Sequence, residues 1–240
     1  LDLVNKSLKK KNFEEAKILI NKSILINPNI PEVYNILGII NFNQGQMDVS
    51  IKNFGKAITL NKNFSAAFCN LANSYSEIKK NKLAIYNFNK AIKTDPKNFN
   101  AHYNLGNFYK NQDDLENSEK YFNLAIDLKP EFFPSYNNLF EVYDRSNQLK
   151  KLDNILKKAQ NIFGNHSLID FFSGIFEYKK KNYHEVIKIF ESIKIDKNDF
   201  NRLAYKNNIL AKSYDFIGNY SKAYDFFLFS NNIIEDAYKG

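Results

Sequence analysis

The residues best suited to catalysis or metal binding are few and widely spaced in this chain. Its histidines and its single cysteine are His102, His166, His184 and Cys69. No two of them stand at the short intervals typical of a metal site, and Cys69 has no partner thiol. The sequence also has no glycine-rich phosphate-binding loop and no nucleophile elbow. It therefore predicts no enzyme, no metal and no cofactor within these residues.

Paired carboxylates and His102 have structural interpretations. Glu14-Glu15 and Asp113-Asp114 fall at or just after expected turns between helices, where acidic side chains interact favourably with the helix dipole. His102 stands where neighbouring segments place Phe68 and Tyr136, one on each side along the chain. We therefore interpret the acids as solvated helix-start residues and His102 as a buried packing residue.

Asparagines recur at a fixed spacing and are the strongest candidates for binding. Asn70, Asn104 and Asn138 stand at equal intervals, and Asn73 and Asn107 follow two of them three residues later. Residues three apart on a helix lie on one side, and an amide offers both a donor and an acceptor. Elsewhere the matching positions hold Asp2, Ile36, Phe172 and Ile209. The column predicts contacts to a bound peptide backbone. The alternative is that these asparagines order the groove and the water molecules in it.

The asparagine spacing belongs to a repeat of about 34 residues that runs through the chain. Between the segments 65–98 and 99–132, equivalent pairs are Leu71/Leu105, Ala72/Gly106, Tyr75/Tyr109, Phe88/Phe122, Ala91/Ala125 and Pro96/Pro130. The apolar positions within each segment follow helical periodicity in two halves. The sequence predicts paired helices with breaks near 43–46, 79–81, 111–113, 147 and 181, and no strands.

This pattern resembles the tetratricopeptide repeat (TPR) family, in which a large apolar residue, Leu-Gly/Ala, Tyr, Ala, Phe, Ala and Pro follow at fixed offsets. The resemblance implies an all-α, right-handed superhelix whose first helices line a concave face. There the asparagine column resembles the ladder of O-linked N-acetylglucosamine transferase, which grips an extended peptide, and Tyr103 is expected to face the groove, where it would favour apolar anchors of the peptide. The cations that other TPR proteins use to hold a C-terminal carboxylate are absent from the matching positions, Cys69, Tyr103, Asn100 and Asn104.

We expect residues 1–240 to form a single solenoid of about seven units. Their expected ranges are about 1–30, 31–64, 65–98, 99–132, 133–166, 167–196 and 204–237. Leu1 falls inside the first unit, which indicates a fragment of a longer protein. The run 219–232 resembles the last repeat of bacterial proteins in which TPR units precede a sulfotransferase domain.

Residue size varies at the positions where paired helices are expected to approach closely. Gly106 and Ala72 are small there, whereas Phe140 and Leu152 place extra volume in the fifth unit. Overpacking of this kind forces neighbouring elements apart. We expect the helix pair of the fifth unit to be more open than those of the third and fourth.

Composition limits the remaining functional classes. The chain has 240 residues, 44% of them hydrophobic, and a net charge of +8. No apolar run reaches the length of a membrane span, and no signal peptide is visible. One cysteine fits a reducing compartment, so a cytoplasmic protein is expected. The surplus Lys is scattered over outward helix faces, so nucleic-acid binding ranks last among the hypotheses.

The function predicted from the sequence is a non-catalytic scaffold that binds a protein or peptide segment in its concave groove, without nucleic-acid or membrane partners. One alternative is the substrate-targeting region of a sulfotransferase or glycosyltransferase whose catalytic domain lies beyond Gly240. A second alternative is a structural array that self-associates through its exposed ends.

Overall fold

The computed structural model describes residue 6 and residues 13–239, and within them all regular secondary structure is helical. The helices are α2 (Phe13–Ile26), α3 (Pro31–Asn43), α4 (Met47–Leu60), α5 (Ser65–Glu77), α6 (Asn81–Thr94), α7 (Phe99–Asn111), α8 (Leu115–Leu128), α9 (Phe133–Arg145), α10 (Leu149–Phe163), α11 (Ser167–Lys179), α12 (Tyr183–Ser192), α13 (Phe200–Phe216) and α14 (Tyr220–Lys239). The predicted all-α class is confirmed. The start of the first predicted repeat, including Asp2, lies outside the described residues.

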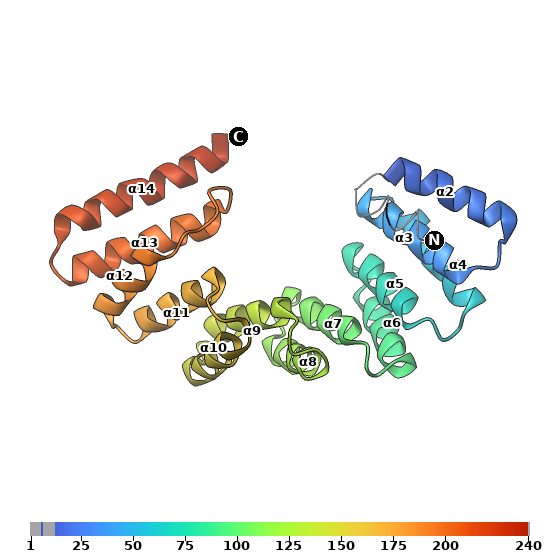
Figure 1. Ribbon diagram of the computed structural model, residues 1–240, viewed down its shortest axis with the longest axis horizontal. Coiled ribbons are helices and arrows are strands. Elements are labelled where there is room, and N and C mark those ends of the chain that lie inside the picture. The colour runs from blue at the N-terminus through green and yellow to red at the C-terminus, as the bar shows by residue number, and fades with distance from the viewer. Residues whose placement is uncertain (1–5, 7–12, 240) are drawn as a thin grey trace. The chain divides into compact units, whose positions relative to one another are not determined.

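The chain divides into two compact units between Lys129 and Pro130. The first unit contains α2 and the pairs α3–α4, α5–α6 and α7–α8, and the second contains α9–α10, α11–α12 and α13–α14. Within each unit, successive helices double back on one another (Figure 1). The predicted breaks between paired helices are all present at the expected residues.

A left-handed residue ends the first helix of each pair. Positive φ angles occur at Gly45, Lys79, Asp113, Asn147 and Lys181, each one repeat after the last. The residue that follows each of them donates its N–H to a carbonyl five residues earlier, as Lys80 does to Tyr75 at 2.8 Å. This is the bond that satisfies a free carbonyl at the helix C-terminus. The backbone therefore turns back in the same way in successive repeats.

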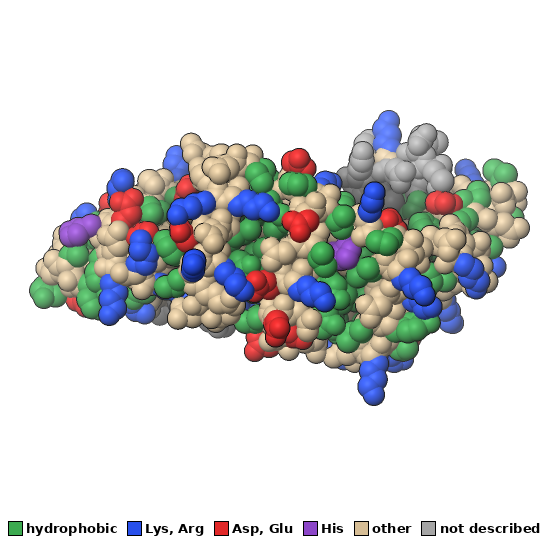
Figure 2. Space-filling view, turned by 90° about the horizontal axis from the view of Figure 1, so that it is seen from below, with side chains coloured by type: hydrophobic (Ala, Val, Ile, Leu, Met, Phe, Trp, Pro, Cys, Tyr) green, Lys and Arg blue, Asp and Glu red, His purple; other side chains and the backbone are tan. Residues whose placement is uncertain are grey.

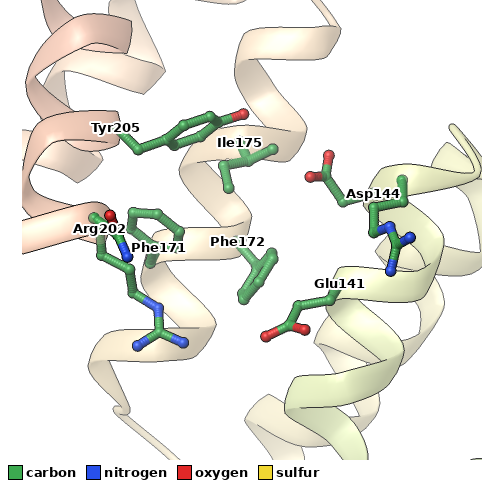
Figure 3. Close-up of a pocket in the computed structure, with 9 residues that line it drawn as sticks. Glu141, Asp144, Phe171, Phe172, Ile175, Arg202 and Tyr205 are labelled. Atoms are coloured by element: carbon green, nitrogen blue, oxygen red, sulfur yellow. The ribbon is translucent and has the colours of Figure 1, made fainter. Parts of the chain in front are cut away.

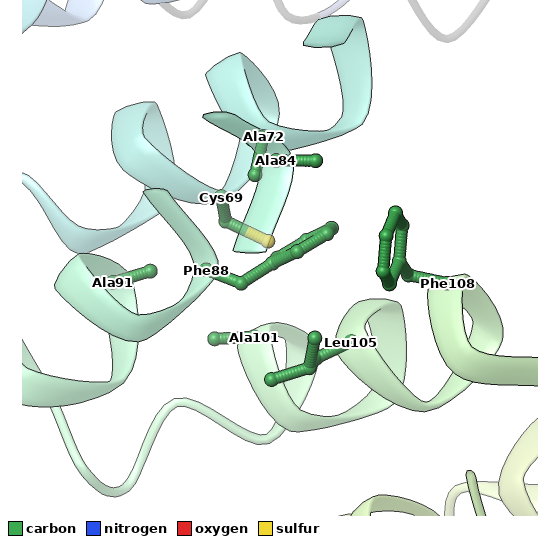
Figure 4. Close-up of a cluster of buried hydrophobic side chains, with 8 residues drawn as sticks. All are labelled: Cys69, Ala72, Ala84, Phe88, Ala91, Ala101, Leu105 and Phe108. Carbon is green, nitrogen blue, oxygen red and sulfur yellow. The ribbon is translucent and has the colours of Figure 1, made fainter. Parts of the chain in front are cut away.

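Paired helices approach closely where a small residue faces a phenylalanine sixteen positions later. A Cβ added at Gly106 would lie 2.8 Å from Phe122 Cδ1, and one at Gly38 would meet Phe54 in the same way. Ala72 and Phe88 occupy this place in the third repeat, inside a buried cluster (Figure 4). The small residue thus creates the space that the ring of its partner helix fills.

The fifth repeat reverses this size pattern. Phe140 is fully buried where the second, third, fourth and sixth repeats have Gly or Ala, and Leu152 is fully buried where Ala84 and Ser118 stand. The residue sixteen positions after Phe140 is Leu156, which is smaller than the usual phenylalanine. The expected opening of this pair stays a prediction.

Residues 197–203, which lie between the ranges expected for the sixth and seventh repeats, are accommodated in two ways. α12 ends at Ser192, a short connection follows, and α13 begins at Phe200. Asp199 caps α13, because its carboxylate accepts a hydrogen bond from Arg202 N at 3.1 Å. The insertion therefore forms a loop and also extends the first helix of this repeat backwards, to 17 residues.

Candidate functional site

An asparagine-rich pocket of about 150 Å³ lies on the first helices of the first unit. It is lined by Phe42, Asn73, Ser76, Glu77, Phe88, Asn104, Asn107, Phe108 and Asn111. All but Phe88 belong to α3, α5 and α7, the first helices of three successive repeats. The pocket therefore has a polar lining above the buried rings of Phe88 and Phe108.

Two equivalent pairs of residues form much of the polar lining. Asn73 and Asn107 stand one repeat apart, and so do Glu77 and Asn111. Within each helix the two members are four residues apart and therefore lie on the same side. The result is two short parallel rows of side-chain donors and acceptors, which suits an extended chain laid across the helices.

The predicted column Asn70, Asn104 and Asn138 has a different environment in the structure. Asn70 Nδ2 donates to Asn35 Oδ1 at 3.0 Å, and Asn104 Nδ2 donates to Cys69 Sγ at 3.1 Å. Both bonds join first helices of adjacent repeats. Asn138, in the second unit, is buried, with 6% of its surface exposed. The amide donors of Asn70 and Asn104 thus connect successive repeats.

The structure therefore brings together three of the predicted site residues, Asn73, Asn104 and Asn107, in one pocket. Tyr103 packs its ring 5.8 Å from the ring of Phe122, against the second helix of its own repeat. Glu77 and Asn111 belong to the pocket but were not predicted from the sequence. Their position one helical turn after Asn73 and Asn107 is the signal that could have identified them.

Cys69 and His102 are buried beside this region. Burial raises the pKa of the Cys69 thiol to about 11, and the hydrogen bond from Asn104 lowers it in part. The thiol is therefore protonated at neutral pH and is a poor nucleophile. His102 Nε2 lies 3.0 Å from the carbonyl oxygen of Pro96, and the ring stacks on Tyr121. His102 is thus buried, as the sequence predicted.

Metal binding, membrane crossing and surface charge are the remaining functional features of the described part of the chain. There, no three His, Cys, Asp or Glu side chains are grouped so that they could hold a metal ion. None of the described helices combines the length and the apolar character that crossing a membrane requires. On the face that Figure 2 shows, Lys and Arg are interspersed with acidic and hydrophobic side chains.

Comparison with known proteins finds family models over three repeats. A model described as "Tetratricopeptide repeat" matches residues 31–64 and 99–132, and one described as "TPR repeat" matches residues 73–113. A curated relative, the uncharacterized protein ycf37 of Pyropia yezoensis, is 33% identical over 82 residues. That match spans 34% of this chain and 43% of the relative.

Solved structures share the fold at low sequence identity. Pseudomonas aeruginosa pilF has a TM-score of 0.67 at 17% identity, and the match covers 82% of this chain and 88% of that one. YrrB, described as a TPR protein with an unusual peptide-binding site, has a TM-score of 0.61 at 22% identity, covering 76% and 93%. The Cut9–Hcn1 hetero-tetramer of the APC/C has a TM-score of 0.67 at 15% identity, covering 96% and 45%.

Proposed function

The chain carries tetratricopeptide repeats in an all-α solenoid, and from this premise we propose that it binds an extended segment of a partner protein across its first helices. The observation that carries the proposal is the pocket in which Asn73, Asn104 and Asn107 converge from adjacent repeats. Solenoids of this class present extended concave surfaces of this kind to their partners.

The recognition follows from the chemistry of the amide groups. Each Asn side chain can accept from a peptide N–H through Oδ1 and donate to a peptide C=O through Nδ2. Since Asn104 Nδ2 already donates to Cys69, we assign the donor role to Asn73. Contacts of this kind read the backbone, so the residues over the pocket should matter less than the residues on either side of it.

The hydrogen bonds also limit the affinity. Each contributes about 1 kcal/mol net, so two amides alone support binding weaker than millimolar. Useful affinity therefore requires further anchors along the same peptide. A second, apolar contact site on the first helices of other repeats would supply these anchors.

The test uses a phage library of random 12-residue peptides selected on the intact chain. A selected peptide, labelled with fluorescein, is then measured by polarisation against the double variant Asn73→Ala, Asn107→Ala. Loss of two hydrogen bonds should weaken binding about 30-fold. Asn89→Ala is the matched control, because Asn89 is exposed on the second helix α6, away from the pocket lining.

Recognition of the peptide backbone can be tested separately from recognition of its side chains. N-methylation of single peptide bonds in the labelled peptide should weaken binding about fivefold at one or two adjacent positions, because methylation removes the N–H donor. If the library yields no peptide above an unrelated control protein, the proposed function is wrong. Equal affinities of the double variant and Asn89→Ala would show that binding occurs elsewhere.

A further inference from the structure

A second pocket, of about 290 Å³, lies on the first helices of the second unit, and we call it the second-unit pocket. Its lining comes from α9, α11 and α13, the first helices of three successive repeats (Figure 3). The apolar part of that lining consists of Phe171, Phe172 and Ile175 on α11 and the ring of Tyr205 on α13. The pocket thus occupies, in this unit, the same kind of surface as the asparagine pocket in the first.

The floor of the second-unit pocket is apolar and largely aromatic. Phe171, Phe172 and Ile175 are buried, with 2–4% of their surfaces exposed. The rings of Phe171 and Phe172 meet edge to face with centroids 5.5 Å apart, and the ring of Tyr205 lies 6.1 Å from that of Phe171. The pocket therefore presents both faces and edges of rings to a ligand, which are the surfaces that another aromatic ring prefers.

Buried rings hold this floor from behind. Phe172 packs against Phe140 of α9 with ring centroids 5.3 Å apart, and Phe171 packs against Phe190 of α12 at 5.8 Å. Both supporting rings are fully buried. Because the floor is fixed before a ligand arrives, binding costs little ordering of these side chains. The large residue of the fifth repeat, Phe140, thus helps to build the second-unit pocket.

Two charged residues of the pocket wall form ion pairs within the chain. Lys179 Nζ lies 2.6 Å from Asp144 Oδ1 and also donates to the Asp144 carbonyl oxygen. Arg202 pairs through Nη1 with Oδ2 of Asp199, three residues earlier on the chain. Each of these charges therefore already has a partner of the opposite sign.

The remaining charged wall residues also interact within the chain. Glu141 Oε1 accepts a hydrogen bond from Asn137 Nδ2 at 3.4 Å, and Glu141 and Arg145 each have a further interaction. Burial, followed by the negative charge of Asp144, raises the pKa of Tyr205, so its hydroxyl is neutral at physiological pH. The charges of the wall are thus engaged by the protein itself, which favours an uncharged ligand.

From this arrangement we propose that the second-unit pocket binds an aromatic side chain, phenylalanine or tyrosine, of the partner segment, with its ring against Phe171, Phe172 and Tyr205. An apolar cavity of about 150 Å³ is enough to hold a benzene ring, so the volume of this pocket admits either side chain. The assignment rests on the proposed function and specifies a residue type that the partner segments contain.

The experiment uses the same random 12-residue phage library on the intact chain. Wild-type protein should enrich phenylalanine or tyrosine at one shared position, relative to selection on an unrelated control protein. A selected peptide, labelled with fluorescein, is then synthesised with alanine at that position. Binding should weaken about 10–100-fold, because the buried area of the ring is lost.

An exchange for cyclohexylalanine separates aromatic recognition from simple burial. Cyclohexylalanine keeps a six-membered apolar ring of similar size and removes the charge distribution of the aromatic ring. Because contacts between aromatic rings contribute beyond the area that they bury, this exchange should weaken binding about threefold or more.

Two protein variants place the ring in this pocket. Tyr205→Ala removes one wall ring at a residue with 46% of its surface exposed, and it should weaken binding of the aromatic peptide about threefold or more. It should also reduce the preference for the aromatic over the cyclohexylalanine peptide, which a general loss of stability does not change. Tyr224→Ala is the matched control, since Tyr224 is exposed on α14 and lies outside the pocket lining.

The outcomes distinguish this inference from the proposed function. If the selected peptides share no aromatic position, or if cyclohexylalanine binds as tightly as the aromatic residue, the aromatic site is refuted while peptide binding stands. Equal affinities of Tyr205→Ala and Tyr224→Ala for the aromatic peptide would place its ring elsewhere and also refute the site. A peptide weakened by Tyr205→Ala but not by the double variant Asn73→Ala, Asn107→Ala would support the aromatic site and reject the asparagine pocket. If no peptides are selected, both proposals fail.

Discussion

Gly106 gives the sharpest test of how the paired helices pack. A Cβ at this position would lie 2.8 Å from both Cδ1 and Cε1 of Phe122 and 3.2 Å from Cγ. Carbon atoms pack optimally at about 3.5–4.0 Å, so Gly106→Ala forces the ring or the helix to move. Overpacking a buried contact in this way costs about 1–3 kcal/mol.

The substitution also has a favourable effect that must be separated from the clash. Replacing Gly by Ala inside a helix stabilises it by about 1 kcal/mol. Gly55 supplies the control, because it lies in α4 and a Cβ there would meet no atom within 4 Å. Gly55→Ala should therefore stabilise the chain, and the difference between the two variants isolates the packing cost, about 1–3 kcal/mol.

The measurement is urea unfolding followed by circular dichroism at the helical band, with the midpoint and slope recorded for each variant. A second comparison places Gly106→Ala in a Phe122→Leu background, where the smaller side chain should remove most of the clash. The fifth repeat already pairs a large residue, Phe140, with Leu156 at these positions. Equal stabilities of Gly106→Ala and Gly55→Ala, within about 0.5 kcal/mol, would refute the packing argument.

Two further predictions concern the turns and the cysteine. Lys79→Gly should stabilise the chain by about 0.5–1 kcal/mol in a thermal melt, because the φ of 59° strains a side chain but not glycine; an unchanged or lower midpoint would contradict this. Cys69, with its pKa raised to about 11, should react with iodoacetamide at pH 8 about 100-fold more slowly in the folded chain than in denaturant, as followed by mass spectrometry; equal rates would show an accessible thiolate.

The helix pairs were predictable because the local residue types and the repeat period indicate the same helix ends. The left-handed position recurs at Gly45, Lys79 and Asp113 at the same point of each repeat, and polar residues follow the apolar run there in each case. Lys79 alone would not mark a turn. Its position one repeat after Gly45 does indicate a turn. The repeat period therefore locates helix ends better than residue type does.

The candidate site was only partly predictable. Spacing identified Asn73 and Asn107, but it could not show that Asn70 and Asn104 donate to the preceding first helix, because the acceptors Asn35 and Cys69 differ in type. The side of a helix that faces its neighbour depends on how repeats stack, and a single sequence does not contain that geometry.

The pocket of the second unit was not predicted at all. Glu141 and Tyr205 belong to different repeats, and no residue of either type recurs at the equivalent positions on the intervening helix α11. A repeat pattern identifies what successive units share. The positions recur, since Glu141 and Arg145 stand one repeat after Asn107 and Asn111, but their residue types differ, so the repeat pattern alone does not reveal this pocket.

The short reach of the contacts determines how the length of the chain can change. Among the described helices, each contacting pair belongs to the same repeat or to adjacent repeats. The hydrogen bond from Asn70 to Asn35, for example, joins neighbours only. Phe64 and Asn98 precede equivalent helices, α5 and α7, so a whole repeat can be removed or duplicated while each remaining helix keeps a neighbour of the kind it had. The length of the chain can therefore be changed in whole repeats without redesigning a core.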